Sequence, residues 1–400
     1  MLGTIVISLL VVFSIATQPS TTPPAALDPS TWSLGLRLYQ KLRLDSGSVN
    51  TLFSPLLVAS SLGAVSEGAA GTTVSQLQQL LEKPKDKTTN AHLSQSLTGF
   101  VEANQTGFML HFSSALFSKK ATLRPSLMSH NEEMLKIKHR PLLEDWSPHK
   151  QIDDWAKAEL FGGFQGGSPV EPEVHLKAGA MIVANALRFK GLWERDFSDR
   201  RNDERTFLGR KYTKVMMMHR AGLYCHFEDM ENMVQVLEVP LWGGEASVVL
   251  LLPFHVENLS RLEKLLTVDL LSNWLQKTNT TSVAISLPRT NISCTLGLQK
   301  QLSALGLIDA WDQEVADFSR VADQSEERLH LGGVLHWASL ELAPEGGEGS
   351  ADLEDEHVER PKLFYADHPF LFFVRDLKTG ALLLMGALDL AEGEALHDEL

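Results

Sequence analysis

The stretch Met181-Ile182-Val183-Ala184-Asn185-Ala186-Leu187-Arg188-Phe189 is an almost unbroken run of apolar side chains near the middle of the chain. A strand this apolar is typical of a sheet that is buried on both faces. Shorter runs rich in β-branched and aromatic residues follow it, at residues 234–239, 247–252, 283–287 and 370–374. The chain from Ala178 onward therefore predicts strands of central sheets.

The first third of the chain has helical patterns instead. Apolar residues recur at helical spacing over residues 34–44, and Ser54-Pro55 opens a second apolar helix that runs to residue 65. Residues 72–81 predict a third helix with Thr72 at its cap. Helices followed by strands predict a mixed α/β (α+β) fold in which helices pack on sheets.

Two segments predict irregular structure. Residues 161–172 are rich in Gly and Pro, which is typical of an irregular crossing. Residues 343–361 are dominated by acidic residues and Gly, and they predict one long exposed loop. Loops of that length are uncommon and are usually functional.

The two ends of the chain carry targeting signals. The apolar run at residues 2–16 is too short to span a bilayer, so residues 1–18 are predicted to be a signal peptide. Residues 19–30 are rich in Pro, Ser and Thr and predict a flexible leader. The last residues, His397-Asp398-Glu399-Leu400, form the address that the retrieval receptor of the endoplasmic reticulum reads. Together the ends predict a soluble protein held in the lumen of the endoplasmic reticulum.

Composition argues against some classes of binding partner and identifies candidate sites of covalent modification. The formal net charge of -14 argues against nucleic acid and anionic membranes, which both favour clustered Lys and Arg. No second apolar run is long enough to span a membrane. Cys225 and Cys294 are the only cysteines, and their pairing stays open. The predicted glycosylation sites are the sequons at Asn104, Asn258, Asn279 and Asn291.

Several motifs, in order along residues 30–390, resemble those of the serpin family. They are Asn50 with Ser54-Pro55, Gly68-Ala69-Ala70-Gly71-Thr72, Asn185-Ala186 with Phe189-Lys190-Gly191, Ala316-Asp317-Phe318-Ser319 and Ala366-Asp367-His368-Pro369-Phe370. The resemblance implies one domain over residues 31–391, with helices packed on three β-sheets and an exposed reactive-centre loop near the C terminus. Residues 392–400 would then be an acidic tail that carries the retention signal.

The predicted loop does not suit protease inhibition. Most serpins inhibit by inserting the cleaved loop into the main sheet as a new strand, which buries alternate residues of the loop. Burial of unpaired charge is costly, so an inserting hinge needs small uncharged residues. The matching stretch instead contains Pro344, Gly346, Gly347, Gly349, Asp352, Glu354, Asp355 and Glu356. We expect that this loop does not insert. A serine protease inhibitor retained in the secretory pathway stays the alternative.

Residues 215–224, 255–267 and 361–369 resemble one branch of the family, the collagen-binding chaperone serpins of clade H. That resemblance implies a non-inhibitory, monomeric chaperone that binds procollagen triple helices in the endoplasmic reticulum and releases them at lower pH. A triple helix exposes imino-acid rings and occasional Arg side chains to such a partner.

The resemblance also implies a binding site. Asp367 would accept a bidentate pair of hydrogen bonds from a collagen Arg. Leu363 and Tyr365 precede it by four and two residues, so on a strand all three would share a face and could cover Pro rings. Further contacts would come from Arg205, Ser286 and Leu208, where Leu208 stands in place of a family Met. The alternatives are ordinary strand packing for Leu363 and Tyr365 and an internal cap or salt bridge for Asp367.

Histidine would supply the release switch, since its unperturbed pKa of about 6.5 lies between neutral and mildly acidic compartments. The candidates that coincide with family histidines are His219, His255, His336 and His368. Protonation of His368 would place a positive charge next to Asp367, where it would compete with the collagen Arg.

Enzyme motifs do not support catalysis. HExxH, GxSxG and Walker motifs do not occur, and Met216-Met217-Met218 is interpreted as strand core rather than as a metal site. We therefore expect a protein that is not an enzyme and uses no metal or cofactor.

Overall fold

The computed structural model describes residues 24–46, 50–82, 88–102, 107–119, 123–143, 147–160, 179–198, 203–256, 259–322, 328–350 and 358–396. Its helices are α1 (Pro29–Ser46), α2 (Pro55–Gly68), α3 (Gly71–Leu80), α4 (Thr88–Glu102), α5 (Pro125–Leu135), α6 (Pro148–Glu159), α7 (Leu259–Leu265), α8 (Val268–Lys277) and α9 (Gln299–Ala304), with a 3-10 turn at Asp309–Trp311. Within these residues, we find no helix with the length and apolar character that a membrane crossing needs.

The strands make up most of the remaining structure. They are β1 (Thr51–Phe53), β2 (Phe108–Lys119), β3 (Ile137–Leu142), β4 (Ala180–Gly191), β5 (Glu204–Leu208), β6 (Tyr212–Asp229), β7 (Val234–Pro240), β8 (Ala246–Pro253), β9 (Asn279–Pro288), β10 (Thr290–Gly297), β11 (His330–Leu342), β12 (Lys362–Tyr365), β13 (Phe370–Asp376), β14 (Leu382–Leu388) and β15 (Glu394–Ala395). Each strand predicted from the sequence lies within β4, β7, β8, β9 or β13.

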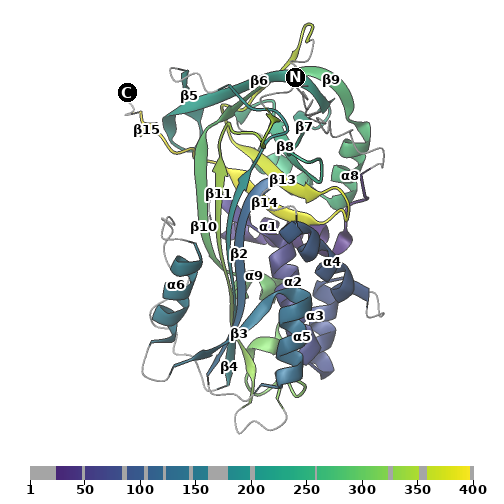
Figure 1. Ribbon diagram of the computed structural model, residues 1–400, viewed down its shortest axis with the longest axis vertical. Helices are drawn as coiled ribbons and strands as arrows, with labels where there is room; N and C mark the ends of the chain where they lie inside the picture. Colours follow the sequence, from purple (N-terminus) through teal and green to yellow (C-terminus); the bar gives the residue numbers. More distant parts are fainter. Residues whose placement is uncertain are drawn as a thin grey trace, which may run out of the picture.

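A five-stranded sheet forms the long axis of the molecule, in the order β10-β11-β4-β2-β3. Figure 1 shows α6 on one side of this sheet and α2, α3 and α5 on the other. The stretch 181–189 is the middle strand, β4, and eight of its residues are buried from Ala180 to Leu187. The prediction of a strand covered on both faces is confirmed.

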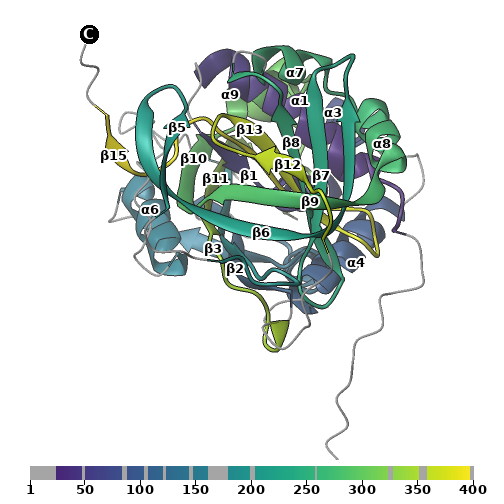
Figure 2. The same cartoon turned by 90° about the horizontal axis from the view of Figure 1, so that it is seen from above.

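The second sheet has ten strands and closes the upper part of the molecule. Its strands β8, β13 and β14 are buried throughout, and their residues are apolar except for Ser247, Arg375 and Asp376. The long strand β6 pairs with β5 and β15 near its start and with β7 near its end. β9 pairs with β6 along the edge opposite to β7. Because β6 bridges these groups, two of the three expected sheets form one hydrogen-bonded set. Seen from above, β6 and β9 cross the top of the molecule with β12 beside them (Figure 2).

The five-stranded sheet is closed where a reactive-centre loop would insert. Strand β11 runs parallel to β4, and the two are paired from His330 and Ala180 to Glu341 and Lys190, with one bulge near Gly333. An inserted strand would have to replace this whole ladder of hydrogen bonds.

Ordered structure begins earlier than the predicted leader allows. The backbone N–H of Ala25 donates to Leu377 O at 2.9 Å and that of Asp28 to Gly380 O at 3.0 Å. Helix α1 starts at Pro29, so residues 25–30 are not a flexible arm. The cap of α3 also differs from the prediction, since Ala70 holds the N-cap position and Thr72 instead donates to Asp309.

The prediction of one exposed loop over residues 343–361 is wrong at its start. Residues 343–350, here called the proximal segment, pack against the chain that follows β4. Trp193 donates from its indole N–H to Ala343 O at 2.7 Å and from its backbone N–H to Glu345 O at 3.2 Å. A Cβ at Gly347 would lie 2.0 Å from Cγ of Trp242, so the backbone rests on that ring because Gly has no side chain.

Candidate functional site

The exposed surface of β12 carries the first part of the candidate site. β12 pairs in parallel with β9, which places Tyr365 opposite Ser286. Along β12, Leu363 is 71% exposed and Tyr365 36% exposed, while Phe364 between them is fully buried. This period of two confirms that Leu363 and Tyr365 share the outward face of the sheet.

Asp367 lies beyond the end of β12 rather than on it, which differs from the expected strand. The backbone N–H of Asp367 donates to Tyr365 O at 3.1 Å, so the chain turns directly after the strand. The Asp367 side chain is 29% exposed, and its Oδ1 lies 2.8 Å from Nδ1 of His368. A tight turn, and not strand alternation, therefore places this carboxylate.

Three neighbouring strands bring His219, Ser286 and Tyr365 into one row. β6 pairs with β9 so that His219 is opposite Ser286, and β9 pairs with β12 so that Ser286 is opposite Tyr365. Nδ1 of His219 lies 2.9 Å from Oγ of Ser286. The next row along the same strands consists of small or exposed apolar residues, Ala221, Ala284 and Leu363. The result is a flat surface with an apolar end and a polar end.

Asp203 belongs to the polar end, and the sequence reasoning missed it. Its Oδ1 accepts an ion pair from Nη2 of Arg205 at 2.9 Å, and its Oδ2 contacts Nε2 of His219. Asp203 thus holds two candidate residues at once. In the sequence, Asp203 is marked only by its place two residues before Arg205, which puts both side chains on one face of an extended chain. The contact with His219 cannot be predicted in this way, because it depends on how the two segments fold together.

The charges of this polar end act on Tyr365. Burial raises the pKa of the Tyr365 phenol, Arg205 opposes that shift, and Asp367 and Asp203 add to it. Arg205, Asp203 and Asp367 are therefore all close enough to Tyr365 for their charges to matter. Leu208 joins the group through its backbone, since its N–H donates to Asp367 O at 2.6 Å. The structure brings all six predicted contact residues to one end of the molecule.

The histidine candidates differ in position. His219 and His368 lie in the site, and His255 is exposed just after β8. His336 is instead fully buried in β11, where its Nε2 accepts a hydrogen bond from the Ser54 N–H at 3.1 Å. Burial lowers the pKa of His336 to about 3. Folded His336 therefore stays neutral between pH 7 and pH 6, which argues against this residue as a release switch.

The buried His336 predicts acid sensitivity of the fold. Unfolded chains protonate His near pH 6.5, whereas folded His336 titrates near pH 3, so the unfolded state binds more protons between these values. The free energy of unfolding should fall on acidification below pH 6.5, by up to ~1.4 kcal/mol per pH unit from this residue. Urea unfolding at pH 7, 6 and 5 should show a shallower dependence for His336→Gln. An unchanged slope, matching that of the exposed control His255→Gln, would refute this origin.

The remaining predicted sites are distributed over the surface or lie outside the described residues. Asn279 and Asn291 are exposed, at the starts of β9 and β10. The signal peptide, Asn104, Asn258 and the residues 397–400 are not among the described residues. Cys225 and Cys294 are free thiols, and burial raises the pKa of Cys294 to about 12. Of the predicted strand core Met216-Met217-Met218, Met217 and Met218 are fully buried, whereas Met216 lies on the same strand but is only half-buried.

Comparisons with known proteins agree with the fold and the motifs. The family model described as serpin (serine protease inhibitor) matches residues 30–389. Serpin H1 of Rattus norvegicus is 38% identical over 378 residues, covering 92% of this chain and 88% of the relative. Serpin H1 of Gallus gallus is 36% identical over 379 residues, covering 92% and 91%. Serpin B8 of Homo sapiens is 31% identical over 369 residues, covering 88% and 96%.

The same fold is found in solved structures. A crystal structure of uncleaved ovalbumin matches with a TM-score of 0.80 at 23% sequence identity, covering 92% of this chain and all of that one. A structure described as a tumour suppressing serpin matches with a TM-score of 0.79 at 22% identity. These structures support the fold of helices on several sheets.

Proposed function

The chain belongs to the serpin family, and from that premise we propose that it is a non-inhibitory member that binds procollagen triple helices as a chaperone in the endoplasmic reticulum. The proposal rests on the likeness to Serpin H1 and on the clade H motifs at residues 215–224, 255–267 and 361–369. The same proposal includes a signal peptide at residues 1–18, which would direct the chain into the endoplasmic reticulum, and binding of residues 397–400 by the retrieval receptor, which would keep it there.

One observation supports the binding role most strongly. A partly exposed carboxylate, Asp367, lies at the end of a strand whose outward residues, Leu363 and Tyr365, are large, apolar and exposed. A guanidinium that forks onto a carboxylate forms a directional, charge-assisted pair. The side chains of Leu363 and Tyr365 beside this carboxylate offer an apolar surface on which imino-acid rings can pack. Each half of the site thus fits one chemical feature of a triple helix.

Binding to model collagen tests the proposal. We expect the mature chain to bind a triple-helical Gly-Pro-Pro peptide that carries one Gly-X-Arg unit at neutral pH. The same peptide heated above its melting temperature and cooled too briefly to refold is the matched control, and it should bind far more weakly. Equal binding to the folded and unfolded peptide would rule out recognition of the triple helix.

Protease inhibition is the alternative, and the proximal segment argues against it. Glu345 pairs with Lys190 at 3.2 Å, and the Gly347 N–H donates to Trp193 O at 3.1 Å. Phe197 donates its backbone N–H to Pro344 O at 2.9 Å. Insertion of the loop into the closed sheet would break these contacts and would place the acidic residues of 352–356 in a strand.

Loop cleavage separates the two functions. Limited proteolysis after acidic residues within 351–357 should leave the unfolding temperature within about 1 °C, the change that ~1 kcal/mol produces in a domain of roughly 360 residues. The products are read by mass spectrometry and the temperature by calorimetry. A large rise in unfolding temperature, or a stable covalent complex with a serine protease, would favour the inhibitor.

A further inference from the structure

A polar hollow lies on the outward face of the five-stranded sheet, and none of its lining residues belongs to β12. Helix α6 covers the lower part of this face, where Ile152 and Trp155 pack with Trp337 and Ala186. The helix ends at Glu159, and above Leu160 none of the residues that the structure describes covers the same face of the sheet. The exposed strands there form the floor of a cavity of about 540 Å³.

The floor is polar because the strand register aligns polar residues. Across β10, β11 and β4, Ser293 lies opposite Ser339, which lies opposite Arg188. One row higher, Asn291 lies opposite Glu341. All of these side chains are partly or fully exposed.

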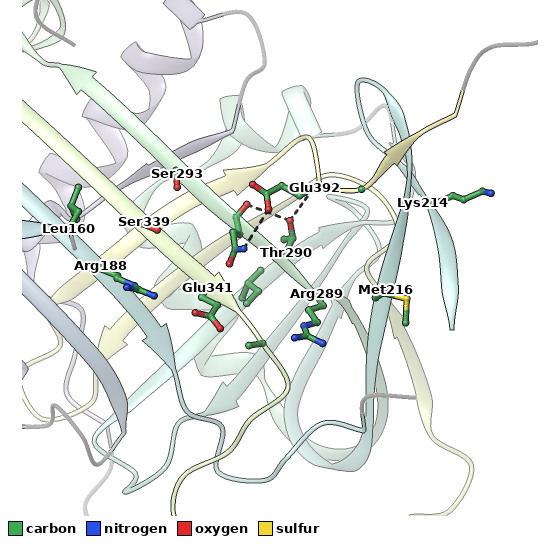
Figure 3. Close-up of a pocket in the computed structure, with 14 residues that line it drawn as sticks. Leu160, Arg188, Lys214, Met216, Arg289, Thr290, Ser293, Ser339, Glu341 and Glu392 are labelled. Atoms are coloured by element: carbon green, nitrogen blue, oxygen red, sulfur yellow. Dashed lines mark hydrogen bonds between the residues drawn. The ribbon is translucent and has the colours of Figure 1, made fainter. Parts of the chain in front are cut away.

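The walls add charges of both signs. Arg289, Glu392 and Met216 belong to the walls (Figure 3). Leu342 also lines the cavity and, with Met216, adds apolar surface. Thr290 accepts the backbone N–H of Glu392 at 3.0 Å, which fixes that wall. The cavity falls within the range of about 300–1,000 Å³ that small-ligand sites occupy.

This lining suits a carbohydrate better than a simple anion. Carboxylates, hydroxyls and guanidinium groups alternate, so the lining both donates and accepts hydrogen bonds. Sugar hydroxyls and acetamido groups do the same. A phosphate or sulfate would meet Glu341 and Glu392 as well as the arginines and would be repelled by them.

We propose that the first sugars of an N-linked glycan on Asn291 occupy this cavity. Asn291 begins the sequon Asn291-Ile292-Ser293, is exposed, and itself lines the cavity. In the transfer, Nδ2 of Asn291 bonds to the anomeric carbon of a lipid-pyrophosphate oligosaccharide, the lipid pyrophosphate leaves, and the amide gives up one proton. The glycan then starts within the cavity, with Ser339 and Arg188 in reach of its core.

The inference rests on the proposed route through the endoplasmic reticulum, where such a glycan is added. Protein secreted or retained by cultured animal cells is analysed by mass spectrometry of glycopeptides, and an endoglycosidase that cuts between the first two sugars is then applied. Release from Asn291 should be about tenfold slower in the native protein than in the denatured protein, equivalent to ~1.4 kcal/mol of protection. The Asn279 sequon, exposed at the start of β9, is the matched control and should show little difference.

Each result is decisive. Arg188→Ala should speed release from native Asn291 without affecting Asn279. An unmodified Asn291 on protein whose other sequons carry glycans overturns this inference alone, as does release that is equally fast before and after denaturation. Absence of glycan from every sequon overturns the route through the endoplasmic reticulum together with it.

Discussion

Replacement of Asp367 by Asn should weaken binding to an Arg-containing triple helix by about a hundredfold, or ~2.7 kcal/mol. The substitution keeps the size of the side chain and one oxygen acceptor, but it removes the charge and the second acceptor that a guanidinium fork requires. Loss of one member of a desolvated, hydrogen-bonded charge pair costs about 2–5 kcal/mol in protein interfaces. Isothermal titration at neutral pH with the peptide carrying one Gly-X-Arg unit measures the effect.

The control for this variant is Glu204→Gln, which removes an exposed carboxylate from the neighbouring strand β5. It lowers the net negative charge by the same amount, so a general electrostatic attraction between an acidic protein and a basic peptide would weaken equally in both variants. If Glu204→Gln and Asp367→Asn lose the same small factor, Asp367 is not the recognition residue. Circular dichroism and unfolding temperature establish that both variants are folded.

Binding should weaken when the pH falls from 7 to 6, by at most about tenfold for each proton that opposes binding. Nδ1 of His368 lies 2.8 Å from Asp367 Oδ1, and Nε2 lies 2.7 Å from Pro253 O. A neutral ring has one N–H and can donate to only one of these oxygens, whereas the protonated ring donates to both. Acid therefore strengthens the internal His368–Asp367 pair, and the collagen Arg must displace it.

The pH dependence can be assigned by substitution. His368→Gln should keep neutral binding and make the affinity less dependent on pH, because Gln cannot become charged. His219 also contacts Asp203 and Ser286, so His219→Gln should remove a second, separate part of the slope. His336→Gln is the negative control, since buried His336 stays neutral over this range. Wild-type binding that is equally tight at both pH values would show that release needs another cause.

Strong apolar runs predicted the buried strands, because burial on both faces leaves little room for polar residues. β4, β8 and β13 were found in this way, while β2 was missed and β6 was predicted only at Met216-Met217-Met218. β2 mixes Ser and His with Phe, and the charged residues of β6 do not alternate regularly with its apolar ones, so both strands lack the continuous apolar run or strict alternation that predicts a strand. Pairing with distant strands decides their structure.

The candidate site was predictable where it follows from strand period. Leu363 and Tyr365 share a face because alternate residues of any strand do. Two other features of the site depend on packing between distant segments: the turn that places Asp367, and the contact between Asp203 and His219. Patterns within one sequence do not predict such packing. His336 gave a clearer signal, since Val334, Leu335 and Trp337 around it are apolar, and that setting indicates burial rather than a switch.

A double-mutant cycle between Asp367 and the collagen Arg tests the central claim most directly. Wild type and Asp367→Asn are each titrated with two triple-helical peptides, one with Arg in the Gly-X-Arg unit and one with Gln in its place. The account predicts that Asp367→Asn loses about a hundredfold in affinity for the Arg peptide and almost nothing for the Gln peptide, a coupling of ~2.7 kcal/mol. Equal losses for both peptides, and so no coupling, would contradict it.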